Sequence, residues 1–499
     1  MQSATSSRTS FNMKKQALAL DLGASGGKIF SGSFDGKRLE IKEIHRFSNA
    51  PINVDGHLYW GFHTIYENLL TGMRMAAADK FNTFAVDAYC NDYGLIDESG
   101  RLLSPIHTYR DSRTEGVLEI MDGIFSPRDL YQRTGNQRAR FNTLVQLAAQ
   151  RHSTESALLD QAKRLLLVPD LINYLLSGVE AAEFTIASVS QFFNRQSAVW
   201  DEDILQAFNL PRRILPEVVE TCTRLGKVKA KILRNLGAAS FDILTVGHHD
   251  TASAVAAVPA ANASFAYISS GTWSLMGVET DKMITTDEAY RLNLANEGGV
   301  GGRNRLIKNI MGLWLLQECQ RQFCENGLNL SIEDLDALAQ QETPFRSLVN
   351  PNDPVFFDPG SMIGKIQNWC HQTRQPIPET PGQITCCIKE SLALCYRETL
   401  EMLEKVTQQK ISCVHIIGGG ARSDLLNQFA ASALQIPVYA GPFEATAIGN
   451  LCTQMMGQGE ISNLAQIRSV VRASFESREF FPQEPSAWDD AFDRFQKLK

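Results

Sequence analysis

The sequence predicts an α/β fold made of two similar halves. Short apolar runs that are typical of strands alternate with longer segments of helical spacing, which is the pattern of α/β proteins. A strand, turn, strand unit at residues 17–34 is followed, roughly half the chain later, by a similar unit at residues 264–278. This repetition indicates a duplicated architecture with two domains that face one another.

Composition restricts the class of function. The chain has 499 residues, of which 44% are apolar and 21% charged, and this ordinary usage excludes collagen-like, disordered and disulfide-scaffold classes. The net charge of −7 offers no basic surface for nucleic acid and no polybasic membrane anchor. No run approaches the roughly 18 apolar residues of a membrane span, and Asp21 interrupts the apolar run 17–20 too early for a signal peptide. We therefore expect a cytoplasmic protein that acts on a small molecule, without nucleic-acid or membrane partners.

The ten cysteines show no metal-binding spacing. None belongs to a C-x-x-C pair, and a long chain without a secretory signal is expected to keep its thiols reduced. The sequence predicts no zinc site, and it leaves open whether Cys370 and Cys387 pair.

The first half begins after an aperiodic, Ser/Thr-rich segment, residues 1–13, which we expect to be a disordered tail. A Pro/Ala/Asn stretch at 259–263 interrupts the periodic pattern, and we place the domain boundary there. The predicted units are domains at 14–260 and 261–480 and a C-terminal segment at 481–499. The predicted strands of the first half are 17–23, 29–34, 83–87 and 242–247, with a helical region at about 144–176.

The second half is predicted to repeat this alternation. Residues 349–381 are rich in Pro, Asn and Asp, and we expect a long surface excursion there. The predicted strands are 264–268, 273–278 and 414–417, and the predicted helices are 308–319, 384–406 and 424–434.

A glycine-bearing turn ends the first strand of each repeat. The turn Asp21-Leu22-Gly23-Ala24-Ser25-Gly26-Gly27-Lys28 combines backbone N–H groups that can approach phosphate oxygens with a carboxylate that can hold a hydrated metal. It is not a Walker A loop, and a β-hairpin without any ligand is the alternative. The second turn, Ser269–Thr272, adds hydroxyl groups. Two such turns from opposite domains favour a nucleotide held in an interdomain cleft.

A third glycine run, Gly418–Gly420, lies between a buried strand and a helix. Glycines there permit close approach by a nucleotide, although they also occur for purely conformational reasons. The run lacks G-x-G-x-x-G spacing, so a dinucleotide fold is not indicated.

Residues His248–Asp250 form a predicted turn between strand 242–247 and a segment that is helix-like from Thr251 onward. Asp250 therefore lies at a helix N-terminus, where the helix dipole favours its carboxylate. Such a carboxylate can accept the proton of a sugar hydroxyl. Aspartate is also a frequent helix N-cap, and from the residues alone we favour the role of N-cap for Asp250. Adjacent histidines on a turn rarely bind one ion, so we expect His249 to contact a substrate rather than a metal.

Taken together, these motifs resemble the FGGY carbohydrate kinases, in particular members that phosphorylate 6-deoxy-ketohexoses. The resemblance extends from about Ala17 to Gln454. It rests on five motifs in order, which are Asp21–Ser25, His249–Ser253, Ser269–Gly277, Lys308–Gln317 and Gly418–Gly420. Further shared stretches are Tyr109–Thr114, Phe141–Leu144, Asn296–Gly299 and Gly441–Ala445.

The resemblance implies two actin-like (ribonuclease H-like) domains with ATP and the sugar in the cleft between them. It also implies that Asp250 is the catalytic base, which reverses the preference for a cap. The other implied contacts are Asp87, Tyr89, Cys90, His249, Thr251 and Asn309 for the sugar, Ala24, Ser25, Gly26, Gly27, Lys28, Thr272, Gln317 and Gly419 for ATP, and Asp21 for Mg²⁺.

Two departures from the family pattern concern the sugar. Members that act on 6-deoxy-ketohexoses usually carry Asp-Thr-Trp-Gly/Ala-Val-Asp where this chain reads Asp87-Ala88-Tyr89-Cys90-Asn91-Asp92. One altered contact of this kind shifts substrate preference by about 1–3 kcal/mol without changing the reaction. Arg138 and Arg140 replace apolar residues, and either could bond a sugar hydroxyl or form a solvated surface pair.

We therefore expect an ATP- and Mg²⁺-dependent kinase that phosphorylates O1 of L-rhamnulose or L-fuculose. Asp87 is expected to assist Asp21 beside the phosphates. The alternatives are a kinase for another ketose, such as L-xylulose or L-ribulose, and a sugar- or ATP-binding regulator without turnover. The protein is expected to be a monomer or a homodimer.

Overall fold

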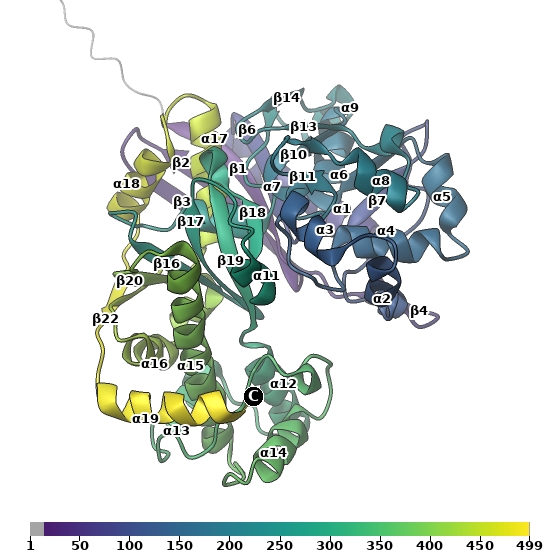
Figure 1. The fold of residues 1–499 in the computed structure, drawn as a ribbon. Coiled ribbons are helices and arrows are strands. Elements are labelled where there is room, and N and C mark those ends of the chain that lie inside the picture. The colour runs from purple at the N-terminus through teal and green to yellow at the C-terminus, as the bar shows by residue number, and fades with distance from the viewer. Residues whose placement is uncertain (1–13, 499) are drawn as a thin grey trace, which may run out of the picture.

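The computed structural model describes residues 14–498, so the tail predicted at residues 1–13 lies outside the described residues. Two mixed β-sheets form the centres of two α/β units (Figure 1). The first sheet has the order β14-β15-β6-β1-β2-β3. Its strands are β1 (Lys15–Leu22), β2 (Gly26–Phe34), β3 (Leu39–Ser48), β6 (Thr83–Ala88), β14 (Arg224–Lys227) and β15 (Asp242–Leu244).

The second sheet repeats the topology of the first. In each, the opening strand pairs antiparallel with the next strand and parallel with a later one: β1 with β2 and β6, and β16 with β17 and β20. The order of the second sheet is β18-β19-β17-β16-β20-β21-β22. Its strands are β16 (Phe265–Ser270), β17 (Trp273–Thr280), β18 (Ala295–Gly298), β19 (Asn304–Met311), β20 (Cys413–Ile417), β21 (Val438–Ala440) and β22 (Arg478–Phe480). The predicted duplication and α/β class are confirmed.

Two helices join the units. Helix α10 (Asp250–Ala256) precedes β16 in the chain, and α17 (Ala445–Gly457), although it comes late in the sequence, packs on α10, β1 and β6 (Figure 1). They approach so closely that a Cβ at Gly449 would lie 1.8 Å from the backbone oxygen of Ser253. One apolar core also includes buried residues of both units, such as Ala19, Val255 and Tyr267. The start of α10 is therefore fixed by packing between the two units.

We propose that the boundary between the two domains lies between α10 and β16, where the sequence predicts it. Helix α17 packs against both domains. The remaining helices of the first unit are α1 (Phe62–Ala76), α2 (Val117–Asp122), α3 (Pro127–Thr134), α4 (Thr143–Arg151), α5 (Ser156–Gln161), α6 (Val168–Ser177), α7 (Phe184–Ala187), α8 (Glu202–Ala207) and α9 (Ala230–Leu236). Its short strands are β4 (Ile52–Val54), β5 (His57–Trp60), β7 (Tyr93–Ile96), β8 (Ile106–His107), β9 (Arg164–Leu167), β10 (Ala181–Glu183), β11 (Phe193–Asn194), β12 (Val199–Trp200) and β13 (Glu217–Val219).

The helices of the second unit cover its sheet and extend below it in Figure 1. They are α11 (Asp287–Arg291), α12 (Trp314–Glu325), α13 (Ile332–Ala339), α14 (Met362–Gln372), α15 (Pro381–Thr407), α16 (Asp424–Leu434), α18 (Leu464–Ser474) and α19 (Pro485–Phe495). No helix of either unit, within residues 14–498, is long and apolar enough to cross a membrane. Cys370 and Cys387 are both free thiols. Helices α15 and α16 confirm the predictions at 384–406 and 424–434.

Three local predictions differ from the structure in whole or in part. Residues 308–319 were expected to be one helix, but they contain the end of β19, a short turn and the start of α12. The helical region at 144–176 contains the three helices α4, α5 and α6 with strand β9 between them. The expected excursion at 349–381 contains α14, whose Met362 and Ile366 are fully buried, so apolar residues anchor this segment in the core.

Candidate active site

One cavity of about 340 Å³ lies between the two units, and both contribute to its walls. The polar part of the wall comes from strand ends and turns on either side. The cavity wall as a whole includes most of the site residues that the sequence predicts. The lining includes Asp21, Ala24, Ser25, Tyr89, Cys90, His249, Asp250, Thr251, Thr272, Asn309 and Gly419.

Two carboxylates lie side by side at the ends of neighbouring parallel strands. Asp21 on β1 is in register with Asp87 on β6. The pKa of Asp21 is raised to about 7: burial is the largest cause, the charge of Lys28 opposes it, and the charge of Asp250 adds to it. Burial also raises the pKa of Asp87 well above its ordinary value, and the neighbouring Asp21 adds to the effect. Asn450 from α17 donates to Asp87 Oδ2 at 2.7 Å, whereas Oδ1 has no hydrogen-bond partner among the described residues. The pair therefore fits a hard cation, since carboxylate oxygens are the ligands that Mg²⁺ prefers.

The first glycine turn meets the cavity only with its tip. Ala24 and Ser25 line the cavity, but Gly26 and Gly27 do not. A Cβ at Gly27 would lie 2.1 Å from the ring of Phe47 on β3, so this glycine permits close strand packing. Lys28 Nζ lies 2.7 Å from Glu444 Oε2, immediately before α17. Lys28 thus connects the two units and affects the cleft through its charge on Asp21.

The second turn and the third glycine run face the cavity from the other unit. Thr272 lines the cavity and its hydroxyl donates to Gln317 Oε1 at 3.1 Å, while Gln317 itself lies outside the lining. Gly418 has φ of 83°, and a Cβ at Gly420 would lie 2.0 Å from Ser270 Oγ, so both positions require glycine. A Cβ at Gly419 would meet open space. The surface beside Gly419 is therefore open to a ligand.

Asp250 begins helix α10 at the cavity wall. The N-cap position belongs to His249, and its side chain makes no cap hydrogen bond, so the alternative of Asp250 as the N-cap is wrong by one residue. Asp250 Oδ1 accepts hydrogen bonds from Thr251 N at 2.6 Å and from Thr251 Oγ1 at 3.1 Å. The side chain of Asp250 is 29% exposed, so it is fixed in orientation and still open to the cavity.

His249 is part of a buried charge cluster. Its Nδ1 lies 3.1 Å from Glu297 Oε2 and 3.1 Å from Arg305 Nη2. Burial disfavours the charged ring, but the neighbouring Cys90 sulfur and Glu297 carboxylate raise the pKa of His249 to about 10. The Glu297 carboxylate favours the charged ring, and the ring's Nε2 can donate a hydrogen bond toward Asp250 Oδ1, which lies 3.5 Å away. In the sequence, Glu297 stands out only as part of the stretch Asn296–Gly299, and no motif points to Arg305.

A second buried network holds the turn that carries His249 and Asp250. His248 Nδ1 lies 2.8 Å from Asp170 Oδ1, and the His248 backbone N–H donates to Glu183 Oε2 at 3.1 Å. The His249 N–H donates to Thr185 Oγ1, whose hydroxyl donates to the same Glu183 oxygen at 2.6 Å. No local motif in the sequence points to Asp170, Glu183 or Thr185, because these residues come from segments far from His248.

The remaining wall is aromatic and sulfur-bearing. Tyr89 stacks on Trp60 with ring centroids 4.5 Å apart, and burial raises the pKa of the Cys90 thiol, which is neutral at pH 7. Phe141 of the first unit meets Trp273 of the second edge to face at 6.2 Å. The Oδ1 of Asn309 has no partner among residues 14–498 and lies in this wall. The cavity thus offers apolar faces with a few polar groups, as small-molecule sites do.

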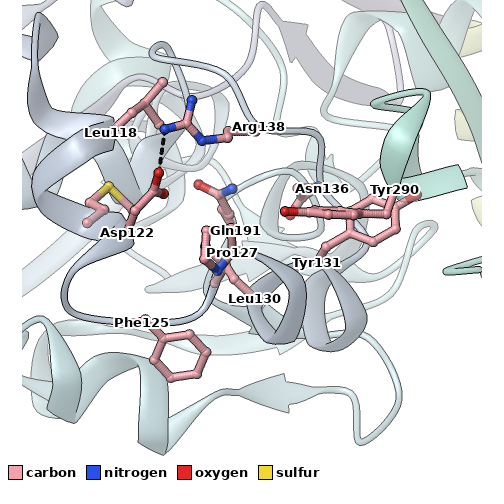
Figure 2. Close-up of a pocket in the computed structure, with 11 residues that line it drawn as sticks. Leu118, Asp122, Phe125, Pro127, Leu130, Tyr131, Asn136, Arg138, Gln191 and Tyr290 are labelled. Carbon is pink, nitrogen blue, oxygen red and sulfur yellow. Dashed lines mark hydrogen bonds and ion pairs between the residues drawn. The ribbon is translucent and has the colours of Figure 1, made fainter. Parts of the chain in front are cut away.

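Arg138 and Arg140 do not line the cleft. Arg138 forms an ion pair with Asp122 at 2.7 Å beside a separate cavity of about 20 Å³ (Figure 2). The Arg140 guanidinium lies over the ring of Phe357 at 4.4 Å. The structure therefore gives no support to a hydroxyl contact by either arginine.

The cleft lies between two α/β units of repeated topology and has turns suited to phosphate and a fixed carboxylate at a helix start. This arrangement suits phosphoryl-transferring enzymes, which work by positioning and electrostatics. The sequence matches the N-terminal domain of the FGGY family of carbohydrate kinases at residues 16–257 and the C-terminal domain at residues 266–457. The chain belongs to this family and is an ATP-dependent sugar kinase.

Named relatives cover almost the whole chain. The rhamnulokinase of Bacteroides thetaiotaomicron is 41% identical over 97% of this chain and 99% of its own length, and that of Bacillus subtilis is 38% identical over 93% and 95%. Among solved structures, the ligand-bound xylulose kinase of Lactobacillus acidophilus has a TM-score of 0.81 at 15% identity, covering 97% of both chains. Plasmodium falciparum glycerol kinase with ADP has a TM-score of 0.78 at 14% identity, covering 98% of both. The solved structures establish the two-domain fold.

Proposed function

We propose that this kinase phosphorylates O1 of L-rhamnulose, with Asp250 as the catalytic base. The observation that carries the proposal is that Asp250, His249 and the tips of both glycine turns line one cavity. The relatives at 35% to 41% identity are named rhamnulokinase, which favours L-rhamnulose over the expected alternative, L-fuculose.

The residues of the cleft support an in-line transfer. Asp250 accepts the proton of the O1 hydroxyl, O1 forms a bond to the γ-phosphorus, and the bond from that phosphorus to the bridging oxygen of ADP breaks. His249 Nε2 donates a hydrogen bond to the sugar beside Asp250, and Thr251 keeps the carboxylate oriented. Asp87, Tyr89, Cys90 and Asn309 are the other proposed sugar contacts.

The phosphates are proposed to meet the tips of both turns. Ala24, Ser25, Thr272 and Gly419 lie at the cavity and suit ATP, whereas Gly26, Gly27, Lys28 and Gln317 support these contacts from behind. Asp21, with Asp87 beside it, would hold Mg²⁺. That ion, when bound, neutralises charge on the β- and γ-phosphates.

The apolar wall favours a 6-deoxy sugar. The methyl group at C6 needs no hydrogen-bond partner, and Tyr89, Cys90 and Phe141 offer ring and sulfur surface to the cavity. A hydroxymethyl group at the same place would leave its hydroxyl unsatisfied. The cytoplasmic location and a monomeric or homodimeric state remain predictions.

The test is a coupled ADP-release assay with Mg²⁺-ATP across L-rhamnulose, L-fuculose, L-xylulose, L-ribulose and glycerol, with NMR assignment of the phosphorylated carbon. We expect the highest kcat/KM on L-rhamnulose and phosphate on O1. A higher kcat/KM on a pentulose would replace the substrate assignment. Absence of turnover on all five sugars, with ATP binding retained, would favour the regulator.

A further inference from the structure

Three potential metal ligands converge outside the cleft. His57 begins β5, His107 ends β8, and Asp111 lies just before the 3₁₀ turn η2 (Ser112–Thr114). One ligand atom from each lies within 4.8 Å of the other two. Strands β5 and β8 pair antiparallel with Tyr59 opposite His107, so the sheet itself brings these residues together.

Both imidazole rings direct Nδ1 toward one carboxylate oxygen. His57 Nδ1 lies 3.2 Å and His107 Nδ1 3.7 Å from Asp111 Oδ1. The other oxygen, Oδ2, accepts a hydrogen bond from Leu58 N at 2.6 Å and fixes the carboxylate. When metal–ligand bonds are about 2.0–2.2 Å long, neighbouring ligand atoms around one ion are separated by distances comparable to these two nitrogen–oxygen distances.

His107 is the observation that points to a ligand. It is 7% exposed, and neither ring nitrogen has a hydrogen-bond partner among the described residues. Its Nε2 lies 3.4 Å from Glu155 Oε2, so carboxylates face both of its nitrogens. A metal ion can bind a ring nitrogen that no hydrogen bond uses, so this buried imidazole offers a ligand atom.

A cation between His107 Nδ1 and Asp111 Oδ1 would use the unpartnered nitrogen. These two atoms lie 3.7 Å apart, and Asp111 Oδ1 also accepts a hydrogen bond from Arg113 N at 3.0 Å, which helps to hold the carboxylate in place. An ion placed there would be bound by both, and the carboxylate on Nε2 would orient the ring, as it does in many zinc sites.

We propose that His57 Nδ1, His107 Nδ1 and Asp111 Oδ1 bind a structural zinc ion, with water in the fourth position. Two imidazoles and one carboxylate form a ligand set that suits Zn²⁺ better than Mg²⁺ or Ca²⁺. Cysteine spacing predicts no zinc site, whereas the pairing of β5 with β8 creates a cluster of ligands that sequence spacing does not reveal. The ion would join β5 to the loop that carries Tyr109, which lines the cleft, so it stabilises the cleft wall and takes no part in phosphoryl transfer.

The test uses tag-free, full-length protein, stripped with a chelator and titrated calorimetrically with ZnCl₂ in the absence of ATP. We expect one saturable site and a higher unfolding temperature with zinc. His57→Asn is the main variant because its side chain is 46% exposed, so folding tolerates it, and it should weaken zinc binding at least tenfold. Asp111→Asn should do the same where it folds.

Two matched controls separate this site from others. His63→Asn removes an exposed histidine paired with Glu67 on α1, and Cys324→Ser removes an exposed thiol. Both should leave the zinc isotherm unchanged. Absence of saturable binding in the wild type, or an unchanged isotherm in His57→Asn, would overturn the proposal, and either result is independent of the sugar that the kinase prefers.

Discussion

Gly449→Ala tests how packing between the units fixes the catalytic helix. The new Cβ would lie 1.8 Å from the backbone oxygen of Ser253 on α10, whereas ordinary contact begins at 3.4 Å. Because the obstructing atom is backbone, α10 and α17 must move apart by more than about 1 Å. Overpacking of this kind costs about 3 kcal/mol, and the gain in helix propensity returns about 1 kcal/mol. The expected net loss is about 2 kcal/mol.

The kcat of Gly449→Ala should also fall, because Asp250 is the first residue of α10. A shift of about 1 Å in a catalytic group lowers kcat by up to about 100-fold. The assays are denaturant unfolding and steady-state kinetics with Mg²⁺-ATP and sugar. Gly364→Ala is the matched control: it is also a helix glycine, but its Cβ would meet only Ser361 Oγ, a rotatable hydroxyl. Wild-type stability and kcat in Gly449→Ala, or equal losses in the control, would refute the reasoning.

Three further predictions concern charge and reactivity in the cleft. Lys28→Met removes a charge that lowers the pKa of Asp21, so that pKa should rise above about 7 and the acidic limb of the kcat/KM profile should move to higher pH; an unmoved limb would contradict this. In Glu297→Gln the pKa of His249 should fall. Because that pKa is about 10 in the folded state and ordinarily near 6.5, charged His249 stabilises the wild type below pH 6.5, and this contribution is lost as the pH rises through about 10. The unfolding midpoint of the variant should therefore fall less steeply over pH 7–10, and equal slopes would count against the cluster. Peptide mapping after alkylation should show Cys90 modified slowly at neutral pH and faster at alkaline pH, because desolvation raises its thiol pKa, and bound sugar should protect it; rapid modification at neutral pH would show that this pKa is not raised.

Local patterns predict the strands and turns of this fold because each depends on residues close in sequence. The run at 17–23 and the turn after it are readable from apolar spacing and glycine alone, and the structure places β1 there. Apolar spacing does not separate the elements at residues 308–319. There the buried strand β19 is followed by helix α12 after a very short connection, so the two apolar patterns merge into one. Likewise, glycine in the first turn suggests phosphate binding at every position, whereas Gly27 serves packing against Phe47.

The charges around the site depend on long-range pairing that spacing cannot reveal. Glu297 and Arg305 stand opposite each other in the register of β18 and β19, and both reach His249 from another unit. No local rule connects these segments. Asp250 was identified by motif resemblance, and only the structure shows that Thr251 fixes its carboxylate.

The most direct test of the account is sugar-dependent ADP release by Asp250→Asn, measured beside the wild type after calorimetry has shown that the variant still binds ATP and sugar. Asparagine keeps the size of the side chain but cannot accept the proton of O1. We predict a loss of kcat of about 10²–10⁴-fold with nearly unchanged binding. A variant that keeps most of its turnover would show that another group activates the sugar and would contradict the proposed role of Asp250.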